Sequence, residues 1–271
     1  MTTESVFDDT ASRKLEAAYL TPDVVEQRHA TLRALGLGPG ERVLDVGSGP
    51  GLLTADMAQT VGPSGYVTGL DVSDAMLALS QRRCGDLNGA GRVGLVKADA
   101  TALPFPDATF DAATSIQVYE YVADLSSALA ELHRVLRPGG RALILDTDWD
   151  SIVWHATDTD RMRRLLATWT QRFADPHLPR SLASQLRAAG FRVNQPQVLV
   201  LLNSDYSPDT YSIANGEIMA DFAVTRGQLT REEANAWLAD LHQVGSQGRY
   251  FFSLNRYLFL ATRQPATDTT A

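Results

Sequence analysis

The sequence predicts a doubly wound α/β sandwich, in which a mostly parallel sheet is covered by helices on both faces. Three observations support this prediction. Short strands alternate with helical segments through the first half of the chain. The strands are apolar throughout, as strands buried on both faces are. A glycine-rich turn joins the first strand to the next helix, at the sheet edge where this fold class binds ligands.

The regular part of the chain contains five predicted strands, at residues 42–46, 66–70, 93–96, 110–116 and 142–145. Thr21 and Pro22 begin a helix before them, with threonine as N-cap and proline in the first turn. Further helical stripes follow at 52–61, 73–77 and 121–136. Later, residues 191–202 and 250–262 are typical of two more strands. The segment between those two contains a capping box formed by Thr230 and Glu233.

Composition excludes several classes of protein. The chain has 271 residues with 44% hydrophobic and 21% charged side chains, which is typical of a globular protein with a full core. Cys84 is the only cysteine, so no intrachain disulfide or cysteine-based metal site can form. The net charge of −8 argues against a partner that is a nucleic acid or an anionic membrane. The amino-terminal residues lack the apolar core of a signal peptide, and no apolar run is long enough to span a membrane, so we expect a soluble cytoplasmic protein.

The most informative stretch is VLDVGSGPG, at residues 43–51. Glycines allow a sharp turn and bring backbone N–H groups close to a ligand. Leu52 stands where a dinucleotide fingerprint has its third glycine, and no Lys-Ser/Thr pair follows as in a P-loop. Taken alone, the stretch is equally consistent with a glycine turn that binds nothing.

Two acidic residues make ligand binding the better interpretation. Asp71 ends the second strand, 26 residues after Asp45, where a carboxylate meets ribose hydroxyls in this fold class. Asp99 follows the third strand, where it can accept a hydrogen bond from an exocyclic amino group. Either residue alone could be a solvated turn residue or a helix cap. Three features at successive strand ends favour a nucleoside site at the carboxyl edge of the sheet.

With VLDVGSGPG, GLDVS, KADATALPFPDATFDAATS and LHRVLRPGGRALI in this order, the chain resembles the class I S-adenosylmethionine-dependent methyltransferases. It is most similar to the small-molecule branch typified by the ubiquinone/menaquinone biosynthesis methyltransferases. The resemblance is strong over residues 41–145 and weaker over the two closing strands. It implies a seven-stranded Rossmann-like sheet whose last strand is antiparallel. It also implies S-adenosyl-L-methionine as cofactor and S-adenosyl-L-homocysteine as product.

The resemblance assigns roles to individual residues. Gly47 and Gly49, with Ser48 between them, are expected beside the methionine part of the cofactor, and Asp45 is expected to support the loop. The remaining expected cofactor residues are Asp71 at the ribose, Val72, Asp99 and Ala100 at the adenine, and Gln117 near the sulfonium methyl. Many relatives have cysteine at the position of Ser48. This difference is expected to matter little, because the loop presents its backbone to the cofactor.

The acceptor side is predicted from polar and aromatic residues beyond the fourth and fifth strands. His155, Glu120 and Tyr119 are candidate catalytic groups, because a base can assist attack by a hydroxyl or an acidic carbon. The alternatives are a surface histidine for His155 and a charge at a helix N-terminus for Glu120, and Tyr121 is interpreted as a core residue of a helical stripe. Candidate acceptor-pocket residues are Tyr19, Asp148, Trp149 and Trp154, with solvated loop charges as the alternative for the acids. The histidines, including His177, lack ligand spacing, so no metal site is predicted.

We expect three parts along the chain: a helical cap at 1–40, the methyltransferase domain at 41–263 and a flexible tail at 264–271. Helical insertions at about 147–180 and 203–248 are predicted to form a lid over the acceptor, or else to extend the core or make a homodimer contact. The expected function is methylation of an O, C or N atom of a quinone-like, aromatic or natural-product-like small molecule in secondary metabolism. The alternative is a protein that binds S-adenosylmethionine without methyl transfer, as a cyclase or a partner subunit.

Overall fold

The computed structural model describes residues 9–264, with side chains from Ser12 onward. One sheet of nine strands runs through this part of the chain, in the order β3-β2-β1-β4-β5-β9-β6, with β7 and β8 also paired to β9. The parallel strands are β1 (Arg42–Val46), β2 (Tyr66–Asp71), β3 (Val93–Lys97), β4 (Phe110–Ile116) and β5 (Leu136–Thr147). Strand β9 (Phe252–Arg263) pairs antiparallel with β5. Three shorter strands pair antiparallel with β9: β6 (Val153–Trp154), β7 (Phe191–Val193) and β8 (Gln197–Asn203).

The predicted fold class, with its antiparallel last strand, is confirmed, but the sheet has nine strands in the described residues instead of the expected seven. Two further details of the prediction are wrong. The predicted strand at 191–202 is two strands, because Pro196 lies in the break between β7 and β8 and has no N–H for a ladder. The predicted helix at 121–136 is also divided. Asp124 accepts a hydrogen bond from the Ser127 N–H and caps a new helix, which leaves Tyr121 in a separate turn.

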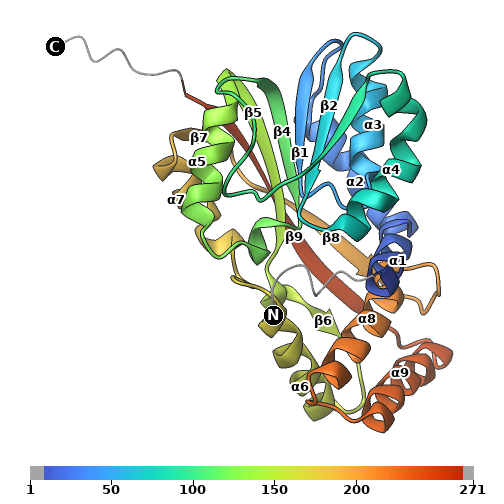
Figure 1. The fold of residues 1–271 in the computed structure, drawn as a ribbon. Helices are drawn as coiled ribbons and strands as arrows, with labels where there is room; N and C mark the ends of the chain where they lie inside the picture. The colour runs from blue at the N-terminus through green and yellow to red at the C-terminus, as the bar shows by residue number, and fades with distance from the viewer. Residues whose placement is uncertain (1–8, 265–271) are drawn as a thin grey trace.

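Helices cover both faces of the sheet (Figure 1). On one face lie α2 (Pro22–Leu35), α3 (Leu52–Val61) and α4 (Asp74–Gly89), and on the other lie α5 (Leu125–Val135) and α7 (Pro179–Ala188). Leu35, Met57 and Cys84 form a core with the first face of the sheet. Leu132 and Leu186 form another with the second face. The apolar strands are therefore buried on both sides, as their composition predicts.

A third core lies below the carboxyl end of the sheet. We call the elements around it the helical region: α1 (Asp9–Tyr19), β6, α6 (Thr159–Trp169), α8 (Tyr211–Thr225) and α9 (Arg231–Ser246). Trp237 of α9 is fully buried there, with its ring 5.2 Å from that of Trp154. The predicted capping box of Thr230 and Glu233 begins α9. Strand β9 enters the helical region with Phe252 and joins it to the sheet.

The described part of the chain also contains short 3₁₀ turns at Tyr119–Tyr121, Trp149–Ser151 and Thr170–Arg172. None of the helices in the described part of the chain has the length and hydropathy of a membrane span. Residues 1–8 of the predicted cap and residues 265–271 of the predicted tail lie outside the described range. The division of the chain at residue 40 stays a prediction.

Candidate active site

A cavity of about 420 Å³ lies at the carboxyl ends of the parallel strands. This volume is within the usual range of about 300–1,000 Å³ for small-molecule sites. The structure brings together every residue that the sequence assigned to the cofactor. The lining includes Asp45, Gly47, Ser48, Gly49, Asp71, Val72, Asp99, Ala100 and Gln117.

The turn after β1 depends on its glycines. Gly47, Gly49 and Gly51 have φ of +68°, +52° and +76°, values that other residues rarely adopt. A Cβ on Gly47 would lie 2.3 Å from a methyl group of Val118. The loop therefore packs directly against the segment after β4, and a side chain at position 47 would force the two apart.

Asp71 ties this loop to the end of β2. Its two carboxylate oxygens accept hydrogen bonds from the N–H groups of Gly49 and Ser73, both at 2.9 Å. Its side chain is almost fully buried, and burial raises its pKa while the backbone N–H groups act in the opposite direction. A nearly buried carboxylate at this edge is suited to bind vicinal hydroxyls.

Asp45 has a supporting position beneath the loop. It accepts hydrogen bonds from the hydroxyls of Thr54 at 2.6 Å and Thr114 at 2.8 Å, and so joins β1 to α3 and β4. Burial raises its pKa to about 6, although both hydroxyls favour the charged form. Asp99 is exposed by contrast, and its Oδ1 accepts hydrogen bonds from the N–H and the hydroxyl of Thr101.

Gln117 directly follows β4 and has a strained backbone, with φ of +56°. Its N–H donates to the Leu145 carbonyl at 2.8 Å, and its Oε1 accepts from the Thr147 hydroxyl at 2.6 Å. Strain of this kind costs about 1–3 kcal/mol and is concentrated at functional sites. Strand β5 thus holds Gln117 in place in the cavity lining.

The far end of the cavity has a different lining. Tyr19, Gln27, Tyr121 and Arg256 line it, and the sequence identified only the first of them as an acceptor residue. Tyr121, expected in the core, lies in the turn after β4 with its ring 4.9 Å from that of Phe173. Burial raises its pKa to about 12. An arginine within the apolar strand LNRYLFLA was the available sequence signal for Arg256.

The other predicted acceptor-pocket residues lie outside the cavity lining. Trp149 stacks on Phe173, with ring centres 5.0 Å apart, and its indole N–H donates to Glu120 at 3.0 Å. The indole N–H of Trp154 donates to the Tyr250 hydroxyl at 3.2 Å. Both tryptophans fill the core of the helical region. No residue of 147–180 or 203–248 lines the cavity, which favours the core alternative for the two insertions.

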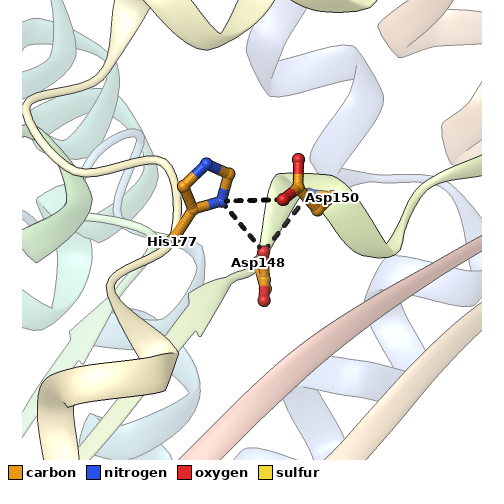
Figure 2. Close-up of side chains that lie close together, drawn as sticks. All are labelled: Asp148, Asp150 and His177. Atoms are coloured by element: carbon orange, nitrogen blue, oxygen red, sulfur yellow. Dashed lines mark hydrogen bonds and ion pairs between the residues drawn. The ribbon is translucent and has the colours of Figure 1, made fainter.

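Asp148 belongs to a cluster of its own (Figure 2). His177 Nδ1 lies 3.1 Å from a carboxylate oxygen of Asp148 and 3.7 Å from one of Asp150. Arg180 forms ion pairs with both acids, at 2.7 and 2.6 Å. Although burial acts to raise the pKa of Asp148, hydrogen bonds from Arg180 and His177 hold it below its ordinary value. The cluster has the ligand types of a metal site, but the guanidinium already neutralises its carboxylates.

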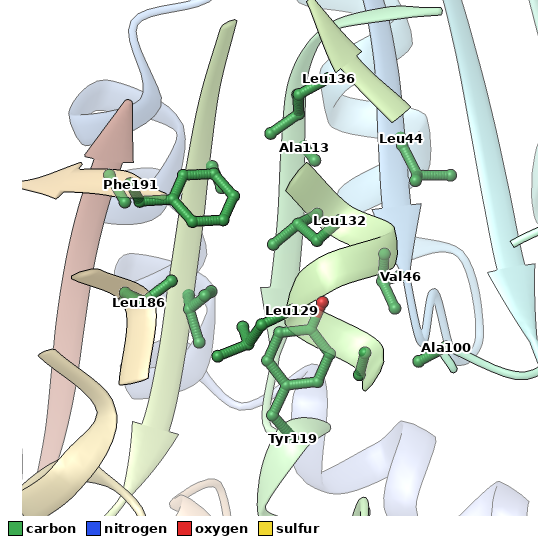
Figure 3. Close-up of a cluster of buried hydrophobic side chains, with 14 of the residues drawn as sticks. Leu44, Val46, Ala100, Ala113, Tyr119, Leu129, Leu132, Leu136, Leu186 and Phe191 are labelled. Atoms are coloured by element: carbon green, nitrogen blue, oxygen red, sulfur yellow. The ribbon is translucent and has the colours of Figure 1, made fainter. Parts of the chain in front are cut away.

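Among the candidate catalytic groups, Tyr119 and His155 do not line the cavity. Tyr119 is buried between the sheet and α5, beside Leu129 (Figure 3). His155 is exposed, and its Nδ1 lies 2.8 Å from the Arg249 carbonyl. A general base must reach the proton that it removes. The structure therefore gives neither residue the position of a catalytic base.

Glu120 is also absent from the cavity lining. Its burial raises its pKa to about 8, although Trp149, Arg256 and Arg172 all favour the charged form. The neighbouring Asp146 is buried as well, and its pKa is raised first by burial and then by the charge of Glu120. The two carboxyl groups form a buried acidic pair behind the acceptor end of the cavity.

Comparisons with known proteins agree with this geometry. The family described as "Methyltransferase domain" matches residues 44–144. The chain is 31% identical over 265 residues to an uncharacterized 37.1 kDa protein in transposon TN4556 of Streptomyces fradiae, covering 97% of this chain and 74% of that one. It is 44% identical over 116 residues to the ubiquinone/menaquinone biosynthesis C-methyltransferase UbiE of Teredinibacter turnerae. That match covers 43% of this chain and 47% of the relative, so it spans less than half of either protein.

Solved structures show the same fold. Phosphoethanolamine N-methyltransferase 2 of Haemonchus contortus, crystallised with S-adenosyl-L-methionine, aligns with a TM-score of 0.64 and 20% identity over 96% of this chain and 58% of that one. The cyclase SpnF aligns with a TM-score of 0.60 and 23% identity over 89% and 82%. The chain belongs to the class I S-adenosylmethionine-dependent methyltransferases. Within them it belongs with the small-molecule methyltransferases, and its cofactor is S-adenosylmethionine.

Proposed function

We propose that this protein transfers the methyl group of S-adenosylmethionine to an O, C or N atom of a small organic molecule. One observation carries the proposal: a single cavity joins the residues of the predicted cofactor site to a second end lined by Tyr19, Tyr121 and Arg256. A bound cofactor and a bound acceptor would therefore share one cavity.

The residues present fit the cofactor. The positive φ of Gly47 and Gly49 lets the backbone approach the methionine part, while buried Asp71 offers a carboxylate to the ribose hydroxyls. Asp99 and Ala100 border the cavity where the adenine would lie. When bound, the cofactor supplies an electrophilic methyl group on a sulfonium centre. The remaining task of the protein is to position the acceptor and exclude water, and positioning can contribute roughly 7–11 kcal/mol.

The acceptor end supports positioning rather than proton abstraction. Burial raises the pKa of both Tyr19 and Tyr121 well above neutrality, so their hydroxyls stay protonated and can donate hydrogen bonds. The carboxylates in the described lining are Asp45, Asp71, Asp99 and Asp124, at or beyond the ends of β1 to β4. We therefore infer that the acceptor enters as a competent nucleophile and that the chain supplies no separate base.

The test is mass spectrometry of reactions that contain the protein, S-adenosylmethionine and a panel of phenols, quinols, enols and amines. A product heavier by one methylene unit, together with S-adenosylhomocysteine, supports methyl transfer. A protein that binds S-adenosylmethionine but forms no S-adenosylhomocysteine with any acceptor contradicts it. A rearranged product of unchanged mass would instead identify a cyclase.

A further inference from the structure

Arg256 is a buried cation at the acceptor end of the cavity. It lines the cavity, yet only 1% of its surface is exposed. Within residues 12–264, no carboxylate lies within the 4.0 Å of an ion pair with it. Arg28 lines the same cavity but is neutralised by Asp56, at 2.8 Å. Of these two lining arginines, only Arg256 lacks a carboxylate partner among the described residues.

Neutral groups hold the Arg256 guanidinium in place. Its Nη1 donates to the Gln27 Oε1 at 2.5 Å, and its central carbon lies 4.6 Å from the centre of the Tyr211 ring. Its Nε is buried and has no hydrogen-bond partner among the described residues. The charge of Arg256 acts on two buried acids, Glu120 and Asp146, whose pKa values are raised by burial, which favours their uncharged forms.

Such an arrangement is costly for the protein on its own. A buried charge without an opposite charge strongly destabilises a fold unless other groups compensate it. The hydrogen bond to Gln27 and the contact with the Tyr211 ring involve neutral partners and compensate only part of that cost. An anion that enters the cavity would supply the missing charge, and a guanidinium presents several donors to an oxyanion.

The position of Arg256 separates it from the cofactor loop. β9 lies three strands from β1 in the sheet order, which corresponds to about 14 Å at the usual strand spacing. In the strand register, Arg256 of β9 pairs with Thr147 of β5, whereas the last residue of β4, Ile116, pairs with Leu145, two residues earlier on β5. Arg256 therefore lies about 7 Å beyond the edge at which β4 ends. This is the acceptor side of the cavity.

We propose that Arg256 binds an oxyanion of the methyl acceptor, so that the substrates are organic anions such as phenolates, enolates or aromatic carboxylates. The inference rests on the proposed function and specifies its substrate class. A guanidinium beside the acceptor oxygen stabilises the deprotonated form of the acceptor. This explains how an acceptor becomes nucleophilic in a cavity without a base at that end.

The probes are salicylate and its neutral amide, salicylamide, which share one flat ring. Calorimetry at neutral pH would measure their affinities for the wild-type protein, with and without S-adenosylhomocysteine. We expect salicylate to bind at least tenfold more tightly than salicylamide. Equal affinities, or no binding of salicylate, would overturn the proposal, and this measurement requires no variant.

Variants then test the assignment to this residue. Arg256→Gln should abolish the preference for salicylate, Arg256→Lys should retain part of it, and the matched Arg28→Gln variant should retain all of it. If Arg28→Gln loses the preference and Arg256→Gln keeps it, Arg28 binds the anion, and the proposal for Arg256 is overturned. Circular dichroism melting shows whether each variant is folded. If Arg256→Gln does not fold, the preference of the wild-type protein for salicylate over salicylamide still tests the proposal.

A second experiment tests whether Arg256 binds the acceptor or the carboxylate of the cofactor. Arg256→Gln should bind S-adenosylhomocysteine and methylthioadenosine, which lacks the amino-acid part, as the wild type does. A weaker affinity for S-adenosylhomocysteine alone would show that Arg256 holds the cofactor carboxylate and would overturn the proposal. Failure of the wild type to bind S-adenosylhomocysteine would contradict the proposed function instead. The salicylate preference would still be known in that case, because it is also measured without S-adenosylhomocysteine.

Discussion

The two ends of the cavity are built in opposite ways. The cofactor end uses residues at or just beyond the ends of β1, β2, β3 and β4, so each strand contributes a short local motif. The acceptor end combines Tyr19 at the end of α1, Tyr121 after β4 and Arg256 on β9. Parallel strands bring their carboxyl ends to one edge automatically. The acceptor end exists only when segments from both ends of the described chain meet.

The largest expected effect tests whether the two ends fold as one unit. Trp237→Ala removes a fully buried ring from the helical region and should lower the free energy of unfolding by about 3–5 kcal/mol. Since β9 carries residues of all three cores, we expect a single transition in urea, with S-adenosylhomocysteine binding lost together with structure. Asn235→Ala, at an exposed position of α9, is the control. Two separate transitions would show that the cofactor end is independent.

The next effect is confined to the cofactor end. Asp71→Ala removes the acceptor of the Gly49 and Ser73 N–H groups and of the ribose hydroxyls. A loss of about 1–3 kcal/mol corresponds to an affinity for S-adenosylmethionine that is roughly 5- to 150-fold weaker. Isothermal titration calorimetry measures this directly. Asp74→Ala, an exposed change on α4, should leave affinity unaltered, and unchanged affinity in folded Asp71→Ala would refute the site.

A separate effect appears in the pH dependence of stability, through the buried Glu120 behind the acceptor end. The pKa of Glu120 is raised to about 8 in the fold, so the folded state keeps a proton that the unfolded chain releases. Stability from this group is complete below its ordinary pKa of 4.5 and is lost as the pH rises through about 8. Relative to Glu120→Gln, the wild type should therefore melt at progressively lower temperature between those limits, by roughly 2–4 °C for each kcal/mol. Parallel melting profiles for the two proteins would contradict the raised pKa.

The smallest effect is expected at His155. This side chain is exposed and lies outside the cavity lining, so His155→Ala should change stability and turnover by less than about 0.5 kcal/mol. Steady-state rates at several pH values measure the effect once an acceptor is known. A loss of turnover at unchanged cofactor affinity would restore His155 as a catalytic group.

The cofactor end was predictable from sequence because its information is local. The glycines of 47–51 and the acids Asp71 and Asp99 each follow an apolar strand, and the topology of the sheet places all strand ends together. The order of these motifs also specified the family. Nothing about Asp71 required knowledge of a distant residue.

The candidate acceptor residues that the sequence offered after the fifth strand do not line the cavity, because distant segments of the chain contact them instead. His177 has no ligand spacing in the sequence, yet the fold places it beside Asp148 and Asp150. Trp149 and Trp154 follow the fifth strand, as pocket residues would, but aromatic side chains of the insertions cover them. An aromatic residue that packs in a core and one that lines a cavity give the same sequence pattern, so the sequence could not distinguish these two positions.

The role of β9 has a consequence for synthesis of the protein. β5, β6, β7 and β8 all pair with this one strand, which begins about a hundred residues after β5 ends. At translation rates of about 5–20 residues per second, the edge of β5 waits roughly 5–20 s for its partner. Nascent chains therefore expose an apolar, unpaired strand edge while the ribosome is still working, and chaperones that shield such edges would protect them until β9 emerges.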